Sequence, residues 1–316
     1  MKRKTGEENV IEKLKEGGLL TSGSDVSLQY TKIPFHIDTL DELVGGGIPK
    51  KRITLLIGPT NTGKSYLASQ IVASVQKEGG TAAWIDTELS WDSKWMEKCG
   101  IDLDSVLVSQ PETGEAAFGV VRELMRNSVD VVVLDSLAGL VPASMHDEDF
   151  SFNPMAWQAR FINGSLPRIM PYLKNGTALI LINQTRSSLG PVSGDTMPGG
   201  LAQTFFAHFT LLVRRSGWIK DGDQNVGFEM EIRCRKSKVG GQPFQSCTIP
   251  FRLEGGIDLV ETVVREAQRK GIIKHAGPWY SVFDEKIMGM NGVRRYLGEN
   301  IEQFERLKEE VRKDLE

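Results

Sequence analysis

A run of eight residues, GPTNTGKS at 58–65, has the residue types that hold a chain of phosphates. It fits the pattern GxxxxGK[ST], in which glycines let backbone amides turn toward phosphate oxygens at the start of a helix. The Lys64 ammonium would reach the β and γ phosphates of a nucleotide, and the Ser65 hydroxyl would bind Mg²⁺. We therefore predict that the nucleotide is bound by Gly58, Pro59, Thr60, Asn61, Thr62, Gly63, Lys64 and Ser65.

Carboxylates end two further apolar segments. The segment VVVLD supplies Asp135, which we predict holds the water shell of Mg²⁺ together with Ser65. A strand-end aspartate is also often just a helix cap. The segment WIDTE supplies Asp86 and Glu88, and a carboxylate there could polarise the attacking water or be a solvated acid. The residue pattern leaves these alternatives open.

Alternating strands and helices must position these residues. Apolar strand-like runs are separated by runs of helical character. This alternation indicates an α/β fold in which a largely parallel sheet is covered by helices on both faces. The expected strands span 52–58, 81–86, 105–110, 129–135 and 177–184, and the expected helices span 64–76, 114–127 and 156–173.

The two ends of the chain differ from this middle part. Residues 7–16 have the pattern of an amphipathic helix, and 24–30 alternate like an edge strand. This piece is too short to fold alone, so it must pack on the core or on another molecule. After residue 205 the pattern indicates antiparallel strands, and after 257 it is mostly helical and charged. We expect an N-terminal helix–strand segment at 1–32, a nucleotide-binding core at 33–256 and a small C-terminal domain at 257–316.

Composition sets broad limits on the function. Of the 316 residues, 40% are hydrophobic and 25% are charged, which suits a soluble globular protein. No apolar run is long enough to cross a bilayer, so we expect a cytoplasmic protein with no membrane partner. A net charge of −3 does not suggest nucleic-acid binding, but clustered Lys and Arg would still permit it. Cys99, Cys234 and Cys247 show no metal spacing and are expected to be reduced thiols.

Longer segments resemble the bacterial RecA recombinases over nearly the whole chain. They include HIDTLDELVGGGIPKKRITLLIGPTNTGKS, SQPETGEAA, VDVVVLDSLAGLVP, LILINQTR and HAGPWYS. Phosphate binding in general does not need SQPETGEAA or HAGPWYS, so these two segments point to this family. The resemblance implies a RecA-type P-loop ATPase core with an antiparallel extension and a small C-terminal α/β lobe. It also implies a DNA-dependent ATPase that uses ATP and Mg²⁺.

The resemblance implies roles for three residues around the nucleotide. Glu88 falls on the glutamate that activates water in the family. Trp95 falls where the family stacks a tyrosine on adenine, although packing within a helix would equally explain a tryptophan there. Asp92 lies near Trp95 in the sequence and could read the adenine amino group.

Four further residues match positions that connect the nucleotide to the rest of the family's assembly. Gln184 matches the glutamine that senses the γ-phosphate and passes its state to the DNA-binding loop after it. Lys236 and Lys238 match two lysines that reach the ATP of the adjacent subunit, where they would stabilise charge in the transition state. Phe205 matches a residue that links the subunit interface to the nucleotide state, although an aromatic residue there could be ordinary core.

Two segments, 145–156 and 185–203, match the loops that face DNA in the family. The first is acidic here, and the second is about two residues shorter than the family's, so phosphate contacts are expected to be weaker. Met155 and Leu189 match the positions at which the family inserts side chains between base triplets. Backbone amides of a Gly-rich loop can bind phosphates. The predicted DNA-binding residues are Met155, Arg160, Arg186, Leu189, Gly199 and Gly200.

Together these patterns predict an ATP-dependent recombinase. It would form a helical filament on single-stranded DNA, pair with a homologous duplex and exchange strands. One alternative is an accessory RecA-like protein without efficient strand exchange, which the short second loop mildly favours. Another is a ring-forming motor with the same core, which the HAGPWYS segment fits poorly. The sequence has no NKxD motif, LSGGQ-like signature or phosphate-acceptor site, which argues against a GTPase, a transporter or a kinase.

Overall fold

The computed structural model describes residues 5–23, 31–145, 154–187 and 195–313. Contacts divide the chain into two units, Met1–Thr31 and Lys32–Glu316. The first contains helix α1 (Thr5–Glu16), at the place where the sequence predicts a helix. The strand predicted at 24–30 lies outside the described residues.

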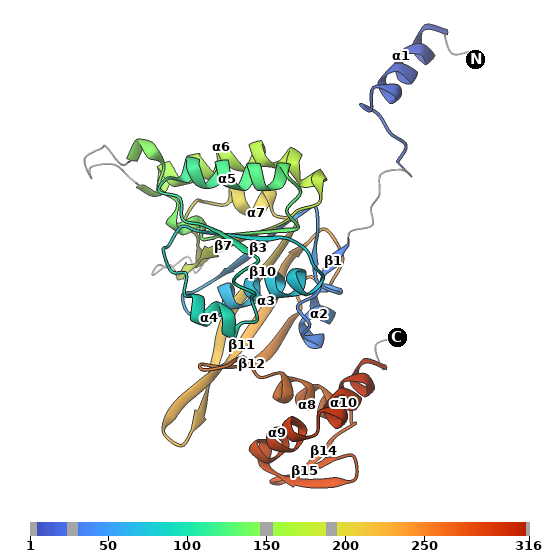
Figure 1. The fold of residues 1–316 in the computed structure, drawn as a ribbon, viewed down its shortest axis with the longest axis vertical. Helices are drawn as coiled ribbons and strands as arrows, with labels where there is room; N and C mark the ends of the chain where they lie inside the picture. Colours follow the sequence, from blue (N-terminus) through green and yellow to red (C-terminus); the bar gives the residue numbers. More distant parts are fainter. Residues whose placement is uncertain (1–4, 24–30, 146–153, 188–194, 314–316) are drawn as a thin grey trace. The chain divides into compact units, whose positions relative to one another are not determined.

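A nine-stranded sheet forms the centre of the second unit (Figure 1). Its order is β13-β12-β11-β10-β3-β7-β6-β4-β5, and neighbours from β10 to β5 are parallel. The strands β10 to β13 are antiparallel to one another, which confirms the predicted parallel sheet with an antiparallel extension. The parallel strands after β10 are β3 (Ile53–Gly58), β7 (Ala178–Gln184), β6 (Val131–Asp135), β4 (Ala82–Asp86) and β5 (Val106–Ser109). The antiparallel ones are β10 (Phe209–Asp221), β11 (Gln224–Ser237), β12 (Ser246–Arg252) and β13 (Gly256–Ile257).

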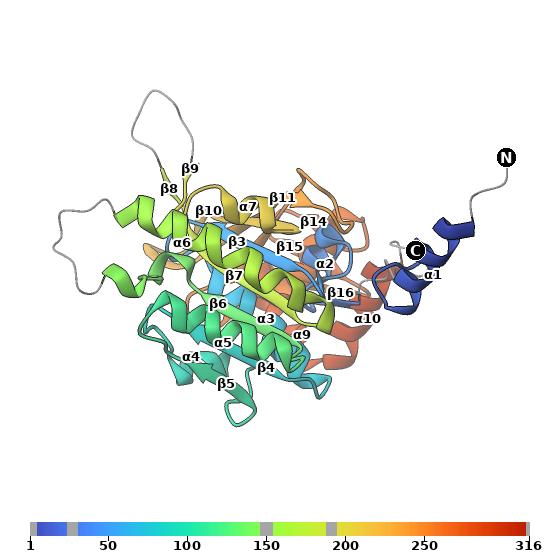
Figure 2. The same ribbon diagram turned by 90° about the horizontal axis from the view of Figure 1, so that it is seen from above.

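Helices cover both faces of the sheet, as Figures 1 and 2 show. Helices α5 (Gly114–Arg126) and α6 (Pro154–Ile169) lie on one face, and α3 (Lys64–Lys77) lies on the other. Because both faces are covered, the parallel strands are apolar at nearly every position and all of β3, β4 and β6 is buried. The helix predicted at 156–173 is shorter, because α6 ends at Ile169 and a 3₁₀ helix follows at Met170–Asn175.

Shorter elements border the sheet. Helix α2 (Asp38–Val44) ends at Gly45, whose left-handed backbone caps it. Strands β1 (Lys32–Ile33) and β2 (Ile48–Pro49) pair with each other, and so do β8 (Arg186–Ser187) and β9 (Asp195–Thr196). Helices α4 (Ser93–Lys98) and α7 (Ala202–Phe206) each carry candidate residues.

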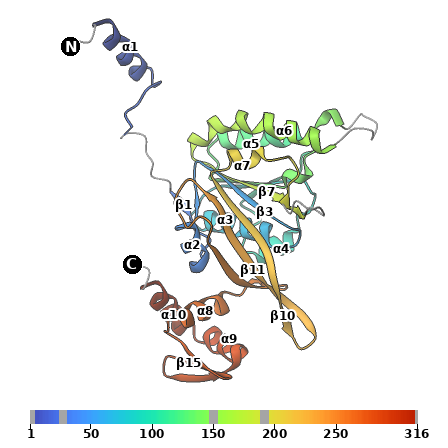
Figure 3. The same ribbon diagram turned by 180° about the vertical axis from the view of Figure 1, so that it is seen from behind.

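The C-terminal part has a hydrophobic cluster of its own, to which Val264, Leu297 and Leu307 belong. Figure 3 shows its elements gathered beside the end of β12. The sequence pattern indicated mostly helix here, but three antiparallel strands also form. The elements are α8 (Leu259–Arg269), β14 (Lys274–Ala276), β15 (Trp279–Val282), β16 (Glu285–Met288), α9 (Gly289–Glu299) and α10 (Ile301–Lys313).

Candidate nucleotide-binding and DNA-facing site

The phosphate loop joins the end of β3 to the start of α3. Gly63 has a φ of +91°, and a Cβ at this position would lie 2.2 Å from Cε of Met230. A Cβ at Gly58 would lie 2.0 Å from the carbonyl oxygen of Val213. The backbone of β10 therefore excludes a side chain at Gly58, whereas at Gly63 the left-handed backbone favours glycine.

The side chain of Lys64 is folded into this loop. It is 7% exposed, and its ammonium donates hydrogen bonds to the carbonyl oxygens of Gly58 (3.0 Å) and Pro59 (2.6 Å). Burial lowers the pKa of Lys64, while the negative charges of Asp135 and Glu88 act in the opposite direction. In this structure the ammonium is therefore held by two carbonyl oxygens of the loop.

The two predicted magnesium ligands are in direct contact. The Ser65 hydroxyl donates to Oδ2 of Asp135 at 2.7 Å. Burial raises the pKa of Asp135 to about 6, and the nearby charges of Glu88 and Asp86 also raise it, whereas the Ser65 hydrogen bond lowers it. A hydroxyl and a carboxylate are hard oxygen donors, and Mg²⁺ commonly binds one or two carboxylates together with substrate phosphates. The residues present therefore fit a magnesium ion.

The two acidic candidates at the end of β4 have different surroundings. Asp86 is buried and accepts hydrogen bonds from the backbone amides of Glu88, Ser90 and Trp91 and from the side chain of Gln110. Its oxygens are therefore used to hold the loop that carries Glu88. Oε1 of Glu88 instead accepts from the Gln184 amide at 3.0 Å and from the Ser136 hydroxyl. Of the two acids, Glu88 is therefore the one that contacts Gln184.

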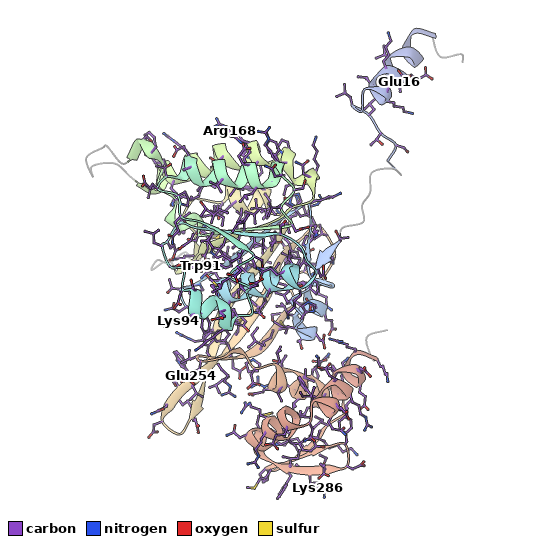
Figure 4. The ribbon with its side chains drawn as sticks, viewed as in Figure 1. Glu16, Trp91, Lys94, Arg168, Glu254 and Lys286 are labelled. Carbon is purple, nitrogen blue, oxygen red and sulfur yellow. The ribbon has the colours of Figure 1, made fainter. Side chains whose placement is uncertain are left out.

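A cavity of about 490 Å³ adjoins the phosphate loop. The half-buried Trp95 lines it, and its ring lies 6.3 Å from that of Tyr66. Trp218 and Phe228, which face each other across β10 and β11, line another side. Figure 4 labels Trp91 and Lys94, which lie at the start of α4, and Glu254, which lies in the turn after β12. The lining residues that our sequence analysis missed are Tyr66, Arg215, Trp218, Phe228, Phe251 and Leu253.

Asp92 has a structural role that we did not predict. Its Oδ1 accepts hydrogen bonds from the backbone amides of Lys94 (2.9 Å) and Trp95 (3.2 Å), so it is the N-cap of α4. The cap fixes the start of the helix that presents Trp95. Contact of Asp92 with a base stays a prediction.

Lys236 lies against the end of α7. Its ammonium donates to the carbonyl oxygens of Thr204 (2.5 Å) and Phe205 (3.3 Å), where cations are favoured by the helix dipole. Burial and the neighbouring charge of Lys238 lower the pKa of Lys236.

The Phe205 side chain is 72% exposed, so it is not the core residue that we had considered as an alternative. Contact of either lysine with a second subunit stays a prediction.

Comparison with known proteins identifies the family. A family model described as the RecA N-terminal domain matches residues 7–258. Proteins named Protein RecA are similar over almost the full chain. That of Lactobacillus johnsonii is 36% identical, over 94% of this chain and 84% of its own length. That of Thermus aquaticus is 37% identical, over 94% and 89%, and that of Aquifex aeolicus is 34% identical, over 96% and 90%.

The chain belongs to the RecA family. The predicted family, fold class and function are thereby confirmed: it is an ATP-dependent DNA recombinase and a DNA-dependent ATPase of the P-loop type. Among the described residues, no helix is long and apolar enough to span a membrane.

The two segments predicted to face DNA, 145–156 and 185–203, are only partly described. The segment 185–203 is less irregular than we expected, because β8 pairs with β9 and α7 begins at Ala202. Gly199 (φ +79°) and Gly200 (φ +69°) lie just before α7. Arg160 is exposed on α6. The structure describes Met155 and Arg186 as parts of α6 and β8, and Leu189 lies outside the described residues.

Proposed function

We propose that this recombinase acts as a helical filament on single-stranded DNA. ATP and Mg²⁺ would lie between subunits, and the filament would pair with a homologous duplex and exchange strands. The observation that carries the proposal is the hydrogen bond between Gln184 and Glu88. Gln184 ends β7, directly before the DNA-facing segment, so one contact joins the nucleotide chemistry to the DNA contacts.

The nucleotide roles follow from the contacts around the loop. Lys64 and the loop amides would hold the β and γ phosphates, and Ser65 with Asp135 would hold Mg²⁺. The metal would supply charge neutralisation between the phosphates. Glu88 would accept a proton from the attacking water, and its contact with Gln184 would fix where its carboxylate points.

The aromatic cavity would take the adenine base. Trp95 lies on one side, and Trp218 lies on another with the Arg215 guanidinium 4.1 Å from the centre of its ring. Flat aromatic walls suit the stacking of a base, and the phosphate loop lies at the same cavity. Lys236 and Lys238 would reach the ATP of the adjacent subunit.

We propose three functional parts with the boundaries expected from the sequence. The N-terminal part, 1–32, would dock on a neighbouring subunit, and the exposed Val10 and Ile11 of α1 are available for such packing. The part 33–256 would be the ATPase core. The part 257–316 would be a small domain, which its separate hydrophobic cluster supports. Met155, Arg160, Arg186, Leu189, Gly199 and Gly200 would contact DNA.

Electron microscopy of the protein with ATP, Mg²⁺ and single-stranded DNA tests the assembly. We expect helical filaments with the wild type, and more persistent ones with Glu88→Gln because hydrolysis would no longer release the DNA. Transfer of a labelled strand from a homologous duplex, measured on the same samples, tests strand exchange. Closed rings would support the ring-forming alternative, and filaments without strand transfer would support the accessory one.

A further inference from the structure

Two side-chain amides are buried where β7 meets the last part of the DNA-facing segment. Asn183 and Gln203 are both 0% exposed. Nδ2 of Asn183 donates to Oε1 of Gln203 (2.7 Å) and to the carbonyl oxygen of Pro198 (2.8 Å). Nε2 of Gln203 donates to the carbonyl oxygens of Pro198 (2.8 Å) and Gly200 (2.9 Å).

Every donor of this pair is used. Oδ1 of Asn183 accepts from the backbone amide of Gln184 at 2.8 Å, so each side-chain oxygen is also occupied. A buried amide contributes little net stability compared with an apolar side chain of similar volume, but a fully satisfied network has one preferred geometry. The main effect of the pair is therefore to fix the positions of Pro198 and Gly200.

The pair is continuous with the nucleotide site. Asn183 precedes Gln184, whose side chain contacts Glu88 at 3.0 Å. On the other side, Gln203 lies in α7 and holds the turn containing Gly199, where a Cβ would lie 2.4 Å from Cδ1 of Ile162. A displacement of the end of β7 would therefore be passed to Gly199 and Gly200 through the hydrogen bonds of Asn183 and Gln203.

We infer that Gln203 is a positioning residue that couples the nucleotide state read by Gln184 to the DNA contacts of Gly199 and Gly200. This inference rests on the proposed function, because its readout is stimulation of ATP turnover by DNA. Gln203 is not among the residues that line the cavity beside the phosphate loop. It acts through Asn183 on one side and through the backbone of the glycine turn on the other.

The test compares Gln203→Leu with Asn175→Leu in the full-length protein. Asn175 is a matched control because its Nδ2 also donates to a backbone carbonyl, that of Met125, but at the far end of β7 from Gln184. For each variant we would measure ATP turnover against the concentration of single-stranded DNA, and the thermal midpoint. We expect Gln203→Leu to raise the DNA concentration for half-maximal stimulation by about ten-fold or more. Asn175→Leu is expected to keep the wild-type value.

A second variant shows whether the two amides act as one unit. Asn183→Leu and the double variant Asn183→Leu/Gln203→Leu should both shift the half-maximal DNA concentration about as much as Gln203→Leu does, because each removes the same link. Wild-type DNA dependence in Gln203→Leu, with only a lower thermal midpoint, would overturn the inference and leave a purely structural role. Absence of DNA stimulation in the wild type would instead contradict the proposed function.

Discussion

At the residue scale, the site separates side chains that meet the nucleotide from side chains that hold them in place. Glu88 and Asp86 lie two residues apart at the end of one strand, yet only Glu88 is directed to Gln184. Asp86 is fully used by the loop after β4. Substitution of Asp86 should therefore lower the stability of the protein, whereas substitution of Glu88 should lower ATP turnover and leave the stability unchanged.

Asp86→Asn should destabilise the protein. An amide at this position turns one acceptor oxygen into an NH₂ group facing N–H donors, which costs about 2 kcal/mol of unfolding free energy. Denaturant unfolding followed by circular dichroism measures this loss. Glu88→Gln serves as the control, since it keeps an acceptor oxygen and should unfold like the wild type. Equal stability of all three proteins would contradict the assigned role of Asp86.

Trp218→Ala should weaken ATP binding. Stacking of a base on an aromatic ring contributes about 1–3 kcal/mol, so we expect an affinity loss of about ten-fold by titration calorimetry. Trp279→Ala is a matched control, because Trp279 is 47% exposed against 46% for Trp218 but lies on β15. If both variants bound ATP like the wild type, Trp218 would not be a wall of the base site.

At the element scale, a titratable group, His208, lies directly before β10 (Phe209–Asp221) and next to β3. Nδ1 of His208 accepts a hydrogen bond from the backbone amide of Ile53 at 3.3 Å, so a proton on Nδ1 would place two donors together. Burial lowers the pKa of His208 from 6.5 to about 4, and the charges of Arg52, Lys238 and Lys236 also lower it. The unfolded state therefore binds a proton more readily than the folded state does.

The contribution of His208 to the free energy of unfolding should consequently fall as pH falls from about 6.5 to about 4, whereas Asp135, with its pKa raised to about 6, acts in the opposite direction. His208 contributes about 2 kcal/mol to this loss once its partial exposure is taken into account. His208→Asn retains an acceptor that does not titrate in this range, so its unfolding free energy should fall less over the same interval. Identical pH dependence in both proteins, measured by urea unfolding, would show that His208 is not responsible.

An element can be predicted from the sequence when residues close together in the chain determine it. The phosphate loop and α3 follow from one contiguous motif, and the buried parallel strands follow from their unbroken apolar runs. The aromatic pair Trp218 and Phe228 could not be predicted, because the two residues meet only through the register of β10 and β11. The choice between Asp86 and Glu88 was open for the same reason: their hydrogen-bond partners come from different strands and loops.

At the scale of the whole molecule, contacts divide the chain into two units, and the first, Met1–Thr31, contains helix α1. Helix α1 leaves Val10 57% and Ile11 46% exposed. Apolar side chains on such a helix indicate a surface that becomes buried on assembly.

The double variant Val10→Ser/Ile11→Ser should keep the wild-type thermal midpoint while losing most filament formation on DNA. Filaments as long as those of the wild type would contradict the proposed role of the N-terminal segment.

DNA should activate ATP hydrolysis at the site formed by Lys64, Asp135 and Glu88. The most direct measurement is steady-state ATP turnover by the purified protein with and without single-stranded DNA, with Glu88→Gln alongside. We predict turnover that rises strongly with DNA in the wild type and is lowered about 100-fold or more in Glu88→Gln, which loses its general base. Turnover indifferent to DNA, or unchanged in Glu88→Gln, would contradict the account.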